Sequence, residues 1–426
     1  MSEHNLMRES FARELDAQDE LGGLSQQFHH PIVDGRQAIY LCGHSLGLQP
    51  KRAELYLQIE LRDWAKLGVD AHFRGSNPWY SYHEWFAAPL ARLVGAQPSE
   101  VVAMNSLTVN LHLMLTSFYR PTRERHTILI DEPTFPSDRY AVESQIRLHG
   151  YDPGTSLLWA EDIEEAIQAR GDEIAVVVIS AVNFLTGRYY DIPRIVQLAQ
   201  ARGCVVGLDL AHAIGNVPLK LHDWGVDFAV WCSYKYLNGG PGAVGGCFVH
   251  DRHGRDLGIP RLAGWWGNDP ATRFRMQLEP NFMPKPGADG WQISNPPILA
   301  MAPLRASLEL FDQAGIDKLR AKSEQLTGFL EMLLDRLPNG RVTQLTPRDP
   351  ARRGGMLALE VHDRPRELFE DMERNGVICD FRELEEDGVM CDFREPNVIR
   401  VTPCPLYNSF TDVWCFVQAL QGRGPT

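Results

Sequence analysis

CVVGLDLAH, residues 204–212, is a short apolar run that ends in an acid, and WCSYKYLNGGPG, residues 231–242, is a second run that ends in a lysine and a glycine-rich turn. Short, almost continuous apolar runs that alternate with helical stretches are typical of parallel strands covered on both faces. In such a sheet the carboxyl ends of the strands face the ligand crevice. The two runs therefore predict that Asp209 and Lys235 lie together at that edge.

The same alternation extends in both directions along the chain. Amphipathic helices are expected at residues 52–66 and 84–94. Two more helices, at residues 137–149 and 193–202, alternate with the expected strands. Further strands are expected at residues 39–42, 127–131, 174–180, 228–233 and 246–250. From about residue 297 two long helical stretches precede a smaller set of strands and helices at residues 341–344, 356–361, 365–375, 397–401 and 411–420. This pattern predicts an α/β domain followed by a smaller α+β domain.

The composition excludes several classes of partner. The chain has 426 residues, a formal net charge of −13 and no long Lys/Arg block, which argues against nucleic acid and anionic membrane surfaces. No apolar run is long enough to span a bilayer, and the first residues do not have the pattern of a signal peptide. The eight cysteines are scattered without a C-x-x-C pair, so we expect reduced thiols in the cytoplasm and no metal site.

Two chemical interpretations of Asp209 and Lys235 are open from the residues alone. A carboxylate at a strand end needs a cationic partner, which a protonated pyridine nitrogen provides, but Asp209 could equally cap a helix. A lysine between aromatic residues is partly desolvated, which favours the neutral amine that forms a Schiff base, but most lysines are simply solvated. The succession of the two strand ends favours a pyridoxal phosphate (PLP) site.

Two helix starts could complete such a site. Leu107 and Thr108 begin a helical stretch whose backbone N–H groups suit a phosphate, although an ordinary helix cap explains them as well. Phe135 lies just after an expected strand and could stack on a pyridine ring, whereas Pro136 and Ser137 also satisfy a turn and a cap.

Several strings resemble those of the kynureninases, which are PLP enzymes of fold type I. They are SLTVNLHL (106–113), FPSD (135–138), GLDLAHAIGN (207–216), HDWGVD (222–227), WCSYKYLN (231–238), ISNPPI (293–298) and PLYNSF (405–410). The resemblance implies a large domain with a mainly parallel seven-stranded sheet. It divides the chain into an N-terminal segment that packs on the small domain (1–50), a large PLP-binding domain (51–300) and a small C-terminal α+β domain (301–426).

The resemblance also implies an activity and a set of site residues. The reaction is hydrolysis of L-kynurenine or 3-hydroxy-L-kynurenine to an anthranilate and L-alanine, in tryptophan degradation or NAD precursor synthesis. Lys235 binds the cofactor covalently, and Asp209 pairs with the pyridine nitrogen. Tyr234 is the candidate proton donor or polariser near the substrate carbonyl, because it adjoins Lys235. Further cofactor contacts come from Leu107, Thr108, Phe135, Pro136, Ser137, Asp138, Ser180, His212 and Tyr234.

The remaining implied contacts involve the substrate and a second subunit. Trp265 and Asn295 complete the cofactor site, from the partner subunit of a homodimer with shared active sites. Arg400 binds the substrate carboxylate with its two-pronged guanidinium. Ser45, His72 and Asn295 approach the substrate.

The sequence departs from the family pattern at two places. His44 replaces the asparagine that the family has in the turn GHSLG, residues 43–47. The segment GVICDFRE, residues 376–383, recurs as GVMCDFRE, residues 388–395. We expect the second copy to take the strand register that leads into Arg400, and the first to lie in a loop or to extend a hairpin.

Two other functions remain open from the sequence. One is a different PLP activity on the same fold, such as a cysteine desulfurase or an aminotransferase. The other is a non-enzymatic binding module, which the presence of Lys235, Asp209 and Arg400 argues against.

Overall fold

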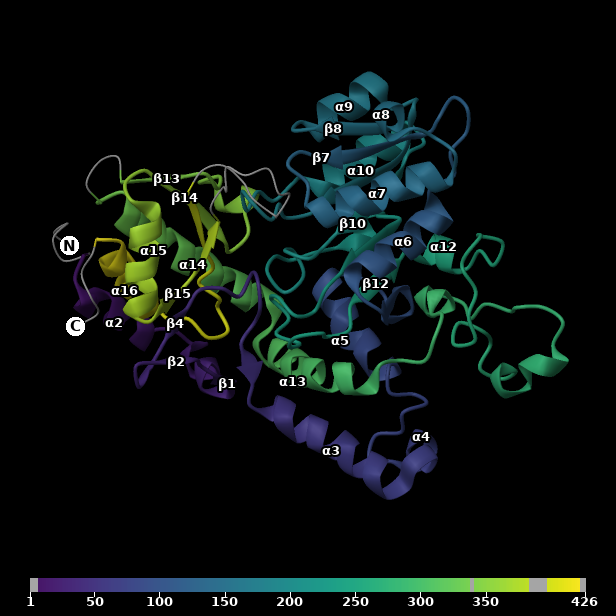
Figure 1. Ribbon diagram of the computed structural model, residues 1–426, viewed down its shortest axis with the longest axis horizontal. Coiled ribbons are helices and arrows are strands. Elements are labelled where there is room, and N and C mark those ends of the chain that lie inside the picture. The colour runs from purple at the N-terminus through teal and green to yellow at the C-terminus, as the bar shows by residue number, and fades with distance from the viewer. Residues whose placement is uncertain (1–6, 338–340, 383–396, 422–426) are drawn as a thin grey trace.

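The large sheet of the computed structural model, which describes residues 7–337, 341–382 and 397–421, has seven strands (Figure 1). Their order is β6-β12-β11-β10-β9-β7-β8. Only β12 runs antiparallel to its neighbours, while the other neighbouring strands of this sheet are parallel. The strands are β6 (Val101–Ala103), β7 (Thr127–Asp131), β8 (Leu157–Ala160), β9 (Ile174–Ser180), β10 (Val205–Asp209), β11 (Phe228–Trp231) and β12 (Gly246–Val249). The predicted mainly parallel sheet is confirmed.

Both faces of this sheet are buried, which explains the continuous apolar strands. In β9, Val177 and Ile179 belong to one core cluster, whereas Val176 and Val178 belong to another. Because strand side chains alternate in direction, these clusters lie on opposite faces of the sheet. The covering helices include α6 (Leu107–Phe118), α7 (Pro136–Leu148), α9 (Ile163–Arg170), α10 (Ile192–Ala201), α5 (Glu84–Val94) and α13 (Ile298–Ala314). A further helix, α3 (Arg52–Leu67), packs against α13.

A second core lies at the other end of the molecule (Figure 1). Its sheet has the order β13-β14-β17-β16, with β13 (Val342–Gln344), β14 (Leu357–Val361), β16 (Asp380–Arg382) and β17 (Val398–Val401). The helices α14 (Ile316–Leu334), α15 (Pro365–Arg374), α16 (Phe410–Leu420) and α2 (Glu9–Ala17) surround it. Ala12 of α2 is fully buried in this core, so the N-terminal helix packs with the C-terminal part of the chain.

The first copy of the repeat is part of the structure. Val377 and Ile378 form β15, which pairs parallel with β4 (Ile39–Tyr40). Asp380 in β16 pairs antiparallel with Arg400 in β17. The backbone of this copy pairs with two strands, so the expectation that it lies in a loop is wrong. The other expectation, that it extends a hairpin, agrees with its antiparallel pairing with β17. The second copy lies outside the described residues.

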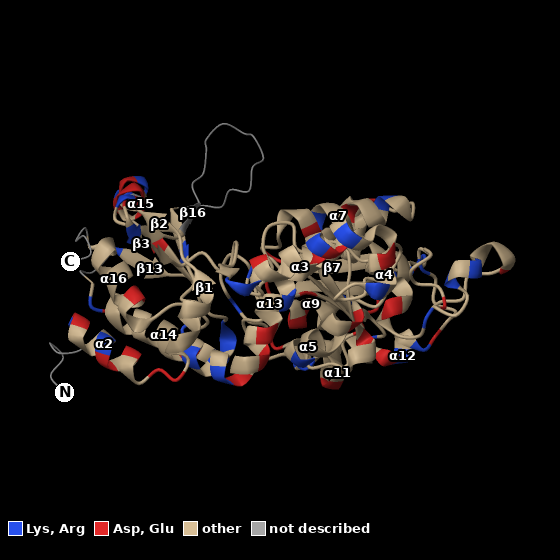
Figure 2. Ribbon diagram, turned by 90° about the horizontal axis from the view of Figure 1, so that it is seen from below, with Lys and Arg blue, Asp and Glu red and all other residues tan. Residues whose placement is uncertain are grey.

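Charged residues are interspersed on the helices that Figure 2 displays, where α15 carries both signs. No helix in the described part of the chain is both long and apolar enough to cross a membrane. The segment after α12 (Asp251–Gly254) projects away from the body of the molecule (Figure 1) and contains a short 3-10 helix, η4 (Arg273–Leu278). Phe274 and Leu278 in this segment are largely exposed.

A buried ion pair stabilises the small domain. The Arg353 side chain is 1% exposed and contacts both carboxylate oxygens of Glu331, one of them at 2.7 Å. Carbonyl oxygens of Pro347 and Arg348 accept further hydrogen bonds from the guanidinium. Removal of the cation would leave a poorly solvated carboxylate without its partner.

We expect Arg353→Met to lower the free energy of unfolding by about 3–5 kcal/mol, the usual cost of breaking a buried pair on one side. Denaturant unfolding followed by circular dichroism measures the change. Arg348→Met is the matched control, since Arg348 pairs with Asp335 at 2.6 Å but both side chains are about half exposed. That control should cost no more than about 1 kcal/mol, and an equal loss in both variants would contradict the argument.

Candidate active site

The pocket lies at the carboxyl edge of the large sheet. Asp209 is the last residue of β10 and pairs with Ser180, the last residue of β9. Lys235 follows β11, the parallel neighbour of β10. The pocket is lined by Leu107, Thr108, Phe135, Asp138, Ser180, Val182, Phe184, Asp209, Ala211, His212, Cys232, Tyr234 and Lys235. The structure thus brings most of the predicted cofactor residues to one place.

The Lys235 amine contacts a buried histidine and an aromatic ring. Its Nζ lies 2.9 Å from His212 Nε2 and 5.7 Å from the centroid of the Phe135 ring. Burial, followed by the charge of Lys235, holds the pKa of His212 well below its usual range. The neutral ring can therefore accept a hydrogen bond from the amine and orient it.

Two buried carboxyl groups face each other beside this amine. Burial raises the pKa of Asp138 and of Asp209, and the charge of Asp209 raises that of Asp138 further. Asp209 Oδ1 accepts the N–H of Ala211 at 2.7 Å. Asp138 Oδ1 is buried and has no hydrogen-bond partner among the described residues. An acidic pair with an unused oxygen fits a ligand that carries a protonated ring nitrogen.

Two helix starts meet beside the pocket, in an arrangement that suits an anion. α6 begins at Leu107 and α7 begins at Pro136. The hydroxyl oxygens of Thr108 and Ser137, each in a first helical turn, are 3.0 Å apart. Helix N-termini offer unpaired N–H groups and a positive dipole end, which suits a phosphate. The pocket therefore fits PLP at both ends, by its acid pair and by its helix starts.

The GHSLG turn rests on the lysine loop. The Gly47 N–H donates to the carbonyl oxygen of Tyr234 at 2.8 Å. A Cβ at position 47 would meet the Lys235 carbonyl oxygen, so only glycine allows this approach. The turn carries Ser45 on its exposed side. His44, the departure from the family pattern, is buried with Nδ1 at 2.9 Å from Thr402 Oγ1, and so it contacts its own chain.

Arg400, in the small domain, contacts a residue that lines the pocket. It lies on β17, is 5% exposed and donates from Nη1 to the carbonyl oxygen of Phe184 at 2.6 Å. The Phe184 ring packs edge-on against Phe135, with centroids 5.2 Å apart. Arg400 is therefore oriented by a residue that also lines the pocket.

Seven predicted residues are not among those that line this pocket: Ser45, Pro136, Ser137 and Arg400, which are described above, and His72, Trp265 and Asn295. His72 bonds through Nδ1 to the Val69 carbonyl oxygen at 3.0 Å. Trp265 is 37% exposed, and Asn295 is exposed. They were expected to act across subunits or at the substrate, and their outward position leaves them available to a second copy.

Sequence reasoning missed several pocket residues. Val182 and Phe184 follow the end of β9, where a strand-end signal was available but only Ser180 was chosen. Cys232 lies within the string that contains Lys235. Asp131, behind the pocket, accepts hydrogen bonds from the hydroxyl and the backbone N–H of Ser180. Its position at the end of β7 was the signal that could have identified it.

Comparison with known proteins identifies the class of enzyme that this fold and site define. The family described as aminotransferase class-V matches residues 57–372. A cysteine desulfurase from Escherichia coli superposes with a TM-score of 0.75 over 95% of this chain and 98% of that one, at 16% identity, which shows a common fold. The chain is thus a fold-type-I enzyme of the class-V aminotransferase group, and its cofactor is PLP.

Closer relatives define the family. A kynureninase from Myxococcus xanthus is 54% identical over 97% of each chain. A kynureninase from Koribacter versatilis is 54% identical over 96% of each chain. The kynureninase C-terminal domain matches residues 382–420. The chain belongs to the kynureninase family.

Proposed function

We propose that the chain hydrolyses L-kynurenine, 3-hydroxy-L-kynurenine or both, releasing anthranilate or 3-hydroxyanthranilate together with L-alanine. The observation that carries the proposal is one pocket that joins Lys235 and an acidic pair, with Arg400 bonded to the pocket residue Phe184, in a chain 54% identical to a kynureninase over nearly its full length. A group for covalent attachment thus lies in the pocket, and a group that suits an amino-acid carboxylate contacts one of its lining residues.

Lys235 and Asp209 have the central roles in this proposal. Bound PLP supplies an electron sink next to the α-carbon of the amino acid. Asp209, kept close to Asp138, holds the ring nitrogen protonated. Lys235 would hold the cofactor covalently, and its amine is placed to move the α-proton of the substrate. His212 accepts a hydrogen bond from the lysine amine and thereby aims it.

Tyr234 and Arg400 act on the substrate. Burial raises the pKa of Tyr234, so its phenol keeps the proton that it donates towards the substrate carbonyl. Arg400 binds the α-carboxylate through its guanidinium, which the hydrogen bond to the Phe184 carbonyl orients. Ser45 approaches from the GHSLG turn, which Gly47 holds against the Tyr234 carbonyl.

The site is completed by a second copy of the chain. Trp265, Asn295 and His72 face outward, and Trp265 packs edge-on against Trp266 at 4.8 Å. The exposed rings of Phe73 and Phe274 lie 6.3 Å apart on the same chain. An apolar surface of this kind supports a homodimer in which these residues enter the partner's pocket.

The division into residues 1–50, 51–300 and 301–426 is part of the same proposal. α13 (Ile298–Ala314) spans the second boundary and packs against α3, so we infer that it connects the two domains. The cytoplasmic location stays a prediction from the scattered cysteines.

Cysteine desulfurase activity is the alternative that the fold allows. It requires a nucleophilic thiol, and the cysteines nearest the site argue against one. Burial raises the pKa of Cys232 and of Cys404 to about 11, which keeps both thiols protonated. Cys391 lies outside the described residues.

Product analysis tests the proposed function directly. The purified holoenzyme is incubated with L-kynurenine, with its 3-hydroxy analogue and with L-cysteine, and the products are separated by chromatography. We expect an anthranilate and L-alanine in equal amounts. Release of sulfide from cysteine, or transfer of the amino group to a keto acid without anthranilate, would replace the proposal by one of its alternatives.

Arg400→Ala should chiefly raise KM. Loss of one partner of a buried, charge-assisted contact costs about 2 kcal/mol or more, which corresponds to about a 30-fold rise. Steady-state kinetics at saturating PLP measure KM and kcat separately. Arg400→Lys keeps the positive charge but not the two-pronged geometry of the guanidinium. Its KM should therefore lie between those of the wild type and Arg400→Ala. A lower kcat with an unchanged KM in Arg400→Ala would assign this residue a different role.

A further inference from the structure

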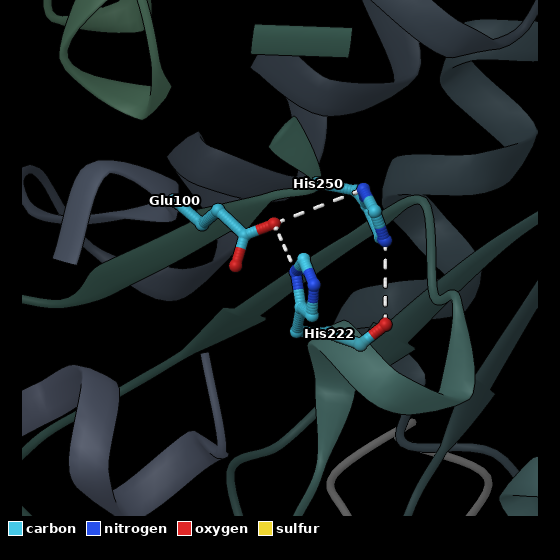
Figure 3. A group of neighbouring side chains, drawn as sticks. All are labelled: Glu100, His222 and His250. Carbon is cyan, nitrogen blue, oxygen red and sulfur yellow. Dashed lines mark hydrogen bonds and ion pairs between the residues drawn. The ribbon is translucent and has the colours of Figure 1, made fainter. Parts of the chain in front are cut away.

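Three side chains that the proposed reaction does not use converge at the amino edge of the large sheet (Figure 3). Glu100 directly precedes β6, His222 lies in α11 (Leu221–Trp224), and His250 directly follows β12. One ligand atom from each lies within 4.8 Å of the others. Since β12 is antiparallel to β11, His250 lies next to the start of β11, at the opposite edge from Lys235. The cluster is therefore separate from the PLP pocket.

The carboxylate of this cluster is fully buried. Glu100 has 0% exposure, and its Oε1 lies 2.8 Å from His222 Nδ1 and 3.7 Å from His250 Nδ1. Backbone N–H groups of Gln97 and Asp251 also donate to it, each at 2.8 Å. A buried carboxylate favours a positive charge nearby, which a bound cation supplies permanently.

Both imidazole rings turn the same nitrogen towards Glu100, as Figure 3 shows. His250 Nε2 lies 3.3 Å from the carbonyl oxygen of His222, which can only accept, so Nε2 carries the proton and Nδ1 presents a lone pair. His222 donates from Nδ1 to Glu100 at 2.8 Å, and its Nε2 accepts from the side-chain amide nitrogen of Gln97 at 3.5 Å. Metal binding through Nδ1 places the proton on Nε2 instead, and the Gln97 amide must then turn its oxygen to accept it.

We propose that Glu100, His222 and His250 bind one Zn²⁺ ion per chain, with water as the fourth ligand. Two imidazole nitrogens and one carboxylate form a common zinc ligand set, and this set disfavours the oxygen-preferring Mg²⁺ and Ca²⁺.

Binding of the ion requires a limited rearrangement. The two rings lie at 18° with centroids 4.9 Å apart, so their in-plane lone pairs do not meet at one point. The His222 side chain is 34% exposed, which gives its ring room to turn, and the ion then replaces the His222–Glu100 hydrogen bond. It also replaces a long contact, at 3.3 Å, from the Arg252 N–H to His250 Nδ1. The ion would connect three segments that are distant in sequence.

The test uses the full-length holoenzyme after dialysis against a chelator. Calorimetric titration with ZnCl₂ and metal analysis after gel filtration give the stoichiometry and the affinity, and X-ray absorption at the zinc edge identifies the ligands. We expect one ion per chain with nitrogen and oxygen ligands, and a higher Tm with zinc. His222→Ala and His250→Ala should each weaken binding by about tenfold or more. Neither variant touches the PLP pocket, so kcat should be unchanged.

His362→Ala is the matched control, because His362 also lies near a carboxylate, with Nδ1 at 4.0 Å from Glu360, but in the small domain. It should bind zinc like the wild type. Zinc that fails to bind, that binds equally in His222→Ala, or that has sulfur ligands overturns the proposal. Glu100 is fully buried, so Glu100→Gln can lose zinc simply by failing to fold. His222 is partly exposed, and zinc binding by His222→Ala therefore decides the test.

Discussion

Replacement of Lys235 by alanine is expected to abolish turnover and the covalent link between the cofactor and the chain. The amine is the only nucleophile among the described pocket residues that lies beside both the ring-stacking Phe135 and the buried His212. Proton transfer by a positioned side chain is worth about 10²–10⁴ in rate, and the variant also loses covalent attachment. We therefore expect kcat to fall by about 10³-fold or more.

Two measurements separate this result from a loss of folding. Borohydride reduction followed by peptide mass spectrometry should find the cofactor on Lys235 in the wild type and on no lysine in the variant. A small primary amine added to Lys235→Ala should restore part of the proton transfer. Lys220→Ala, an exposed lysine of the same domain, is the control and should keep full activity. Turnover near the wild-type rate in Lys235→Ala would refute the assignment.

Asp209→Ala is expected to retain part of the bound PLP but to lose most of the rate. The helix starts at Leu107 and Pro136 still hold the phosphate, whereas the ring nitrogen loses the acid that keeps it protonated. Removal of one such electrostatic contact costs about 10²–10³ in kcat. Steady-state kinetics, with the bound cofactor measured by its absorbance, give both quantities.

The neighbouring acid provides the control for that experiment. Asp138 faces Asp209, so Asp138→Asn tests whether a single carboxylate is enough to keep the nitrogen protonated. We expect Asp138→Asn to lose less activity than Asp209→Asn, because only Asp209 is fixed by the Ala211 N–H at the end of β10. Equal losses of activity in the two variants would mean that both carboxyl groups, and not Asp209 alone, keep the ring nitrogen protonated.

The large sheet could be predicted because its physical cause is present in the sequence. A strand buried on both faces must be apolar throughout, and the runs that end at Ser180 and Asp209 have this property. The expected helix at residues 84–94 has the same bounds as α5 (Glu84–Val94). β8 (Leu157–Ala160) was not predicted, since it is only partly buried and follows directly on a one-turn helix, α8 (Pro153–Ser156).

The site was predictable where a side chain carries the chemistry. Lys235 and Asp209 could be found because their residue types fit a role at a strand end, whereas Asp138 was named only through the resemblance to the kynureninases. The contact between Arg400 and Phe184 could not, because a backbone carbonyl is the acceptor and any residue has one. The two copies of the repeat have nearly the same sequence, so the sequence pattern predicts the same structure for both. The pairing of Val377 with Ile39, which the sequence does not reveal, shows that the first copy forms a strand.

The hydrogen bond from Arg400 to the Phe184 carbonyl has a thermodynamic consequence. It makes a continuous path from the group that would recognise a carboxylate, through the Phe184 ring, to Phe135 at the cofactor face. A ligand that restricts the motion of Phe135 also restricts Phe184 and, through it, the Arg400 guanidinium. Binding of the coenzyme therefore reduces the conformational entropy that is lost when the amino acid binds. Affinity for an amino acid should then rise when the coenzyme is present, and by reciprocity the amino acid should slow loss of the coenzyme.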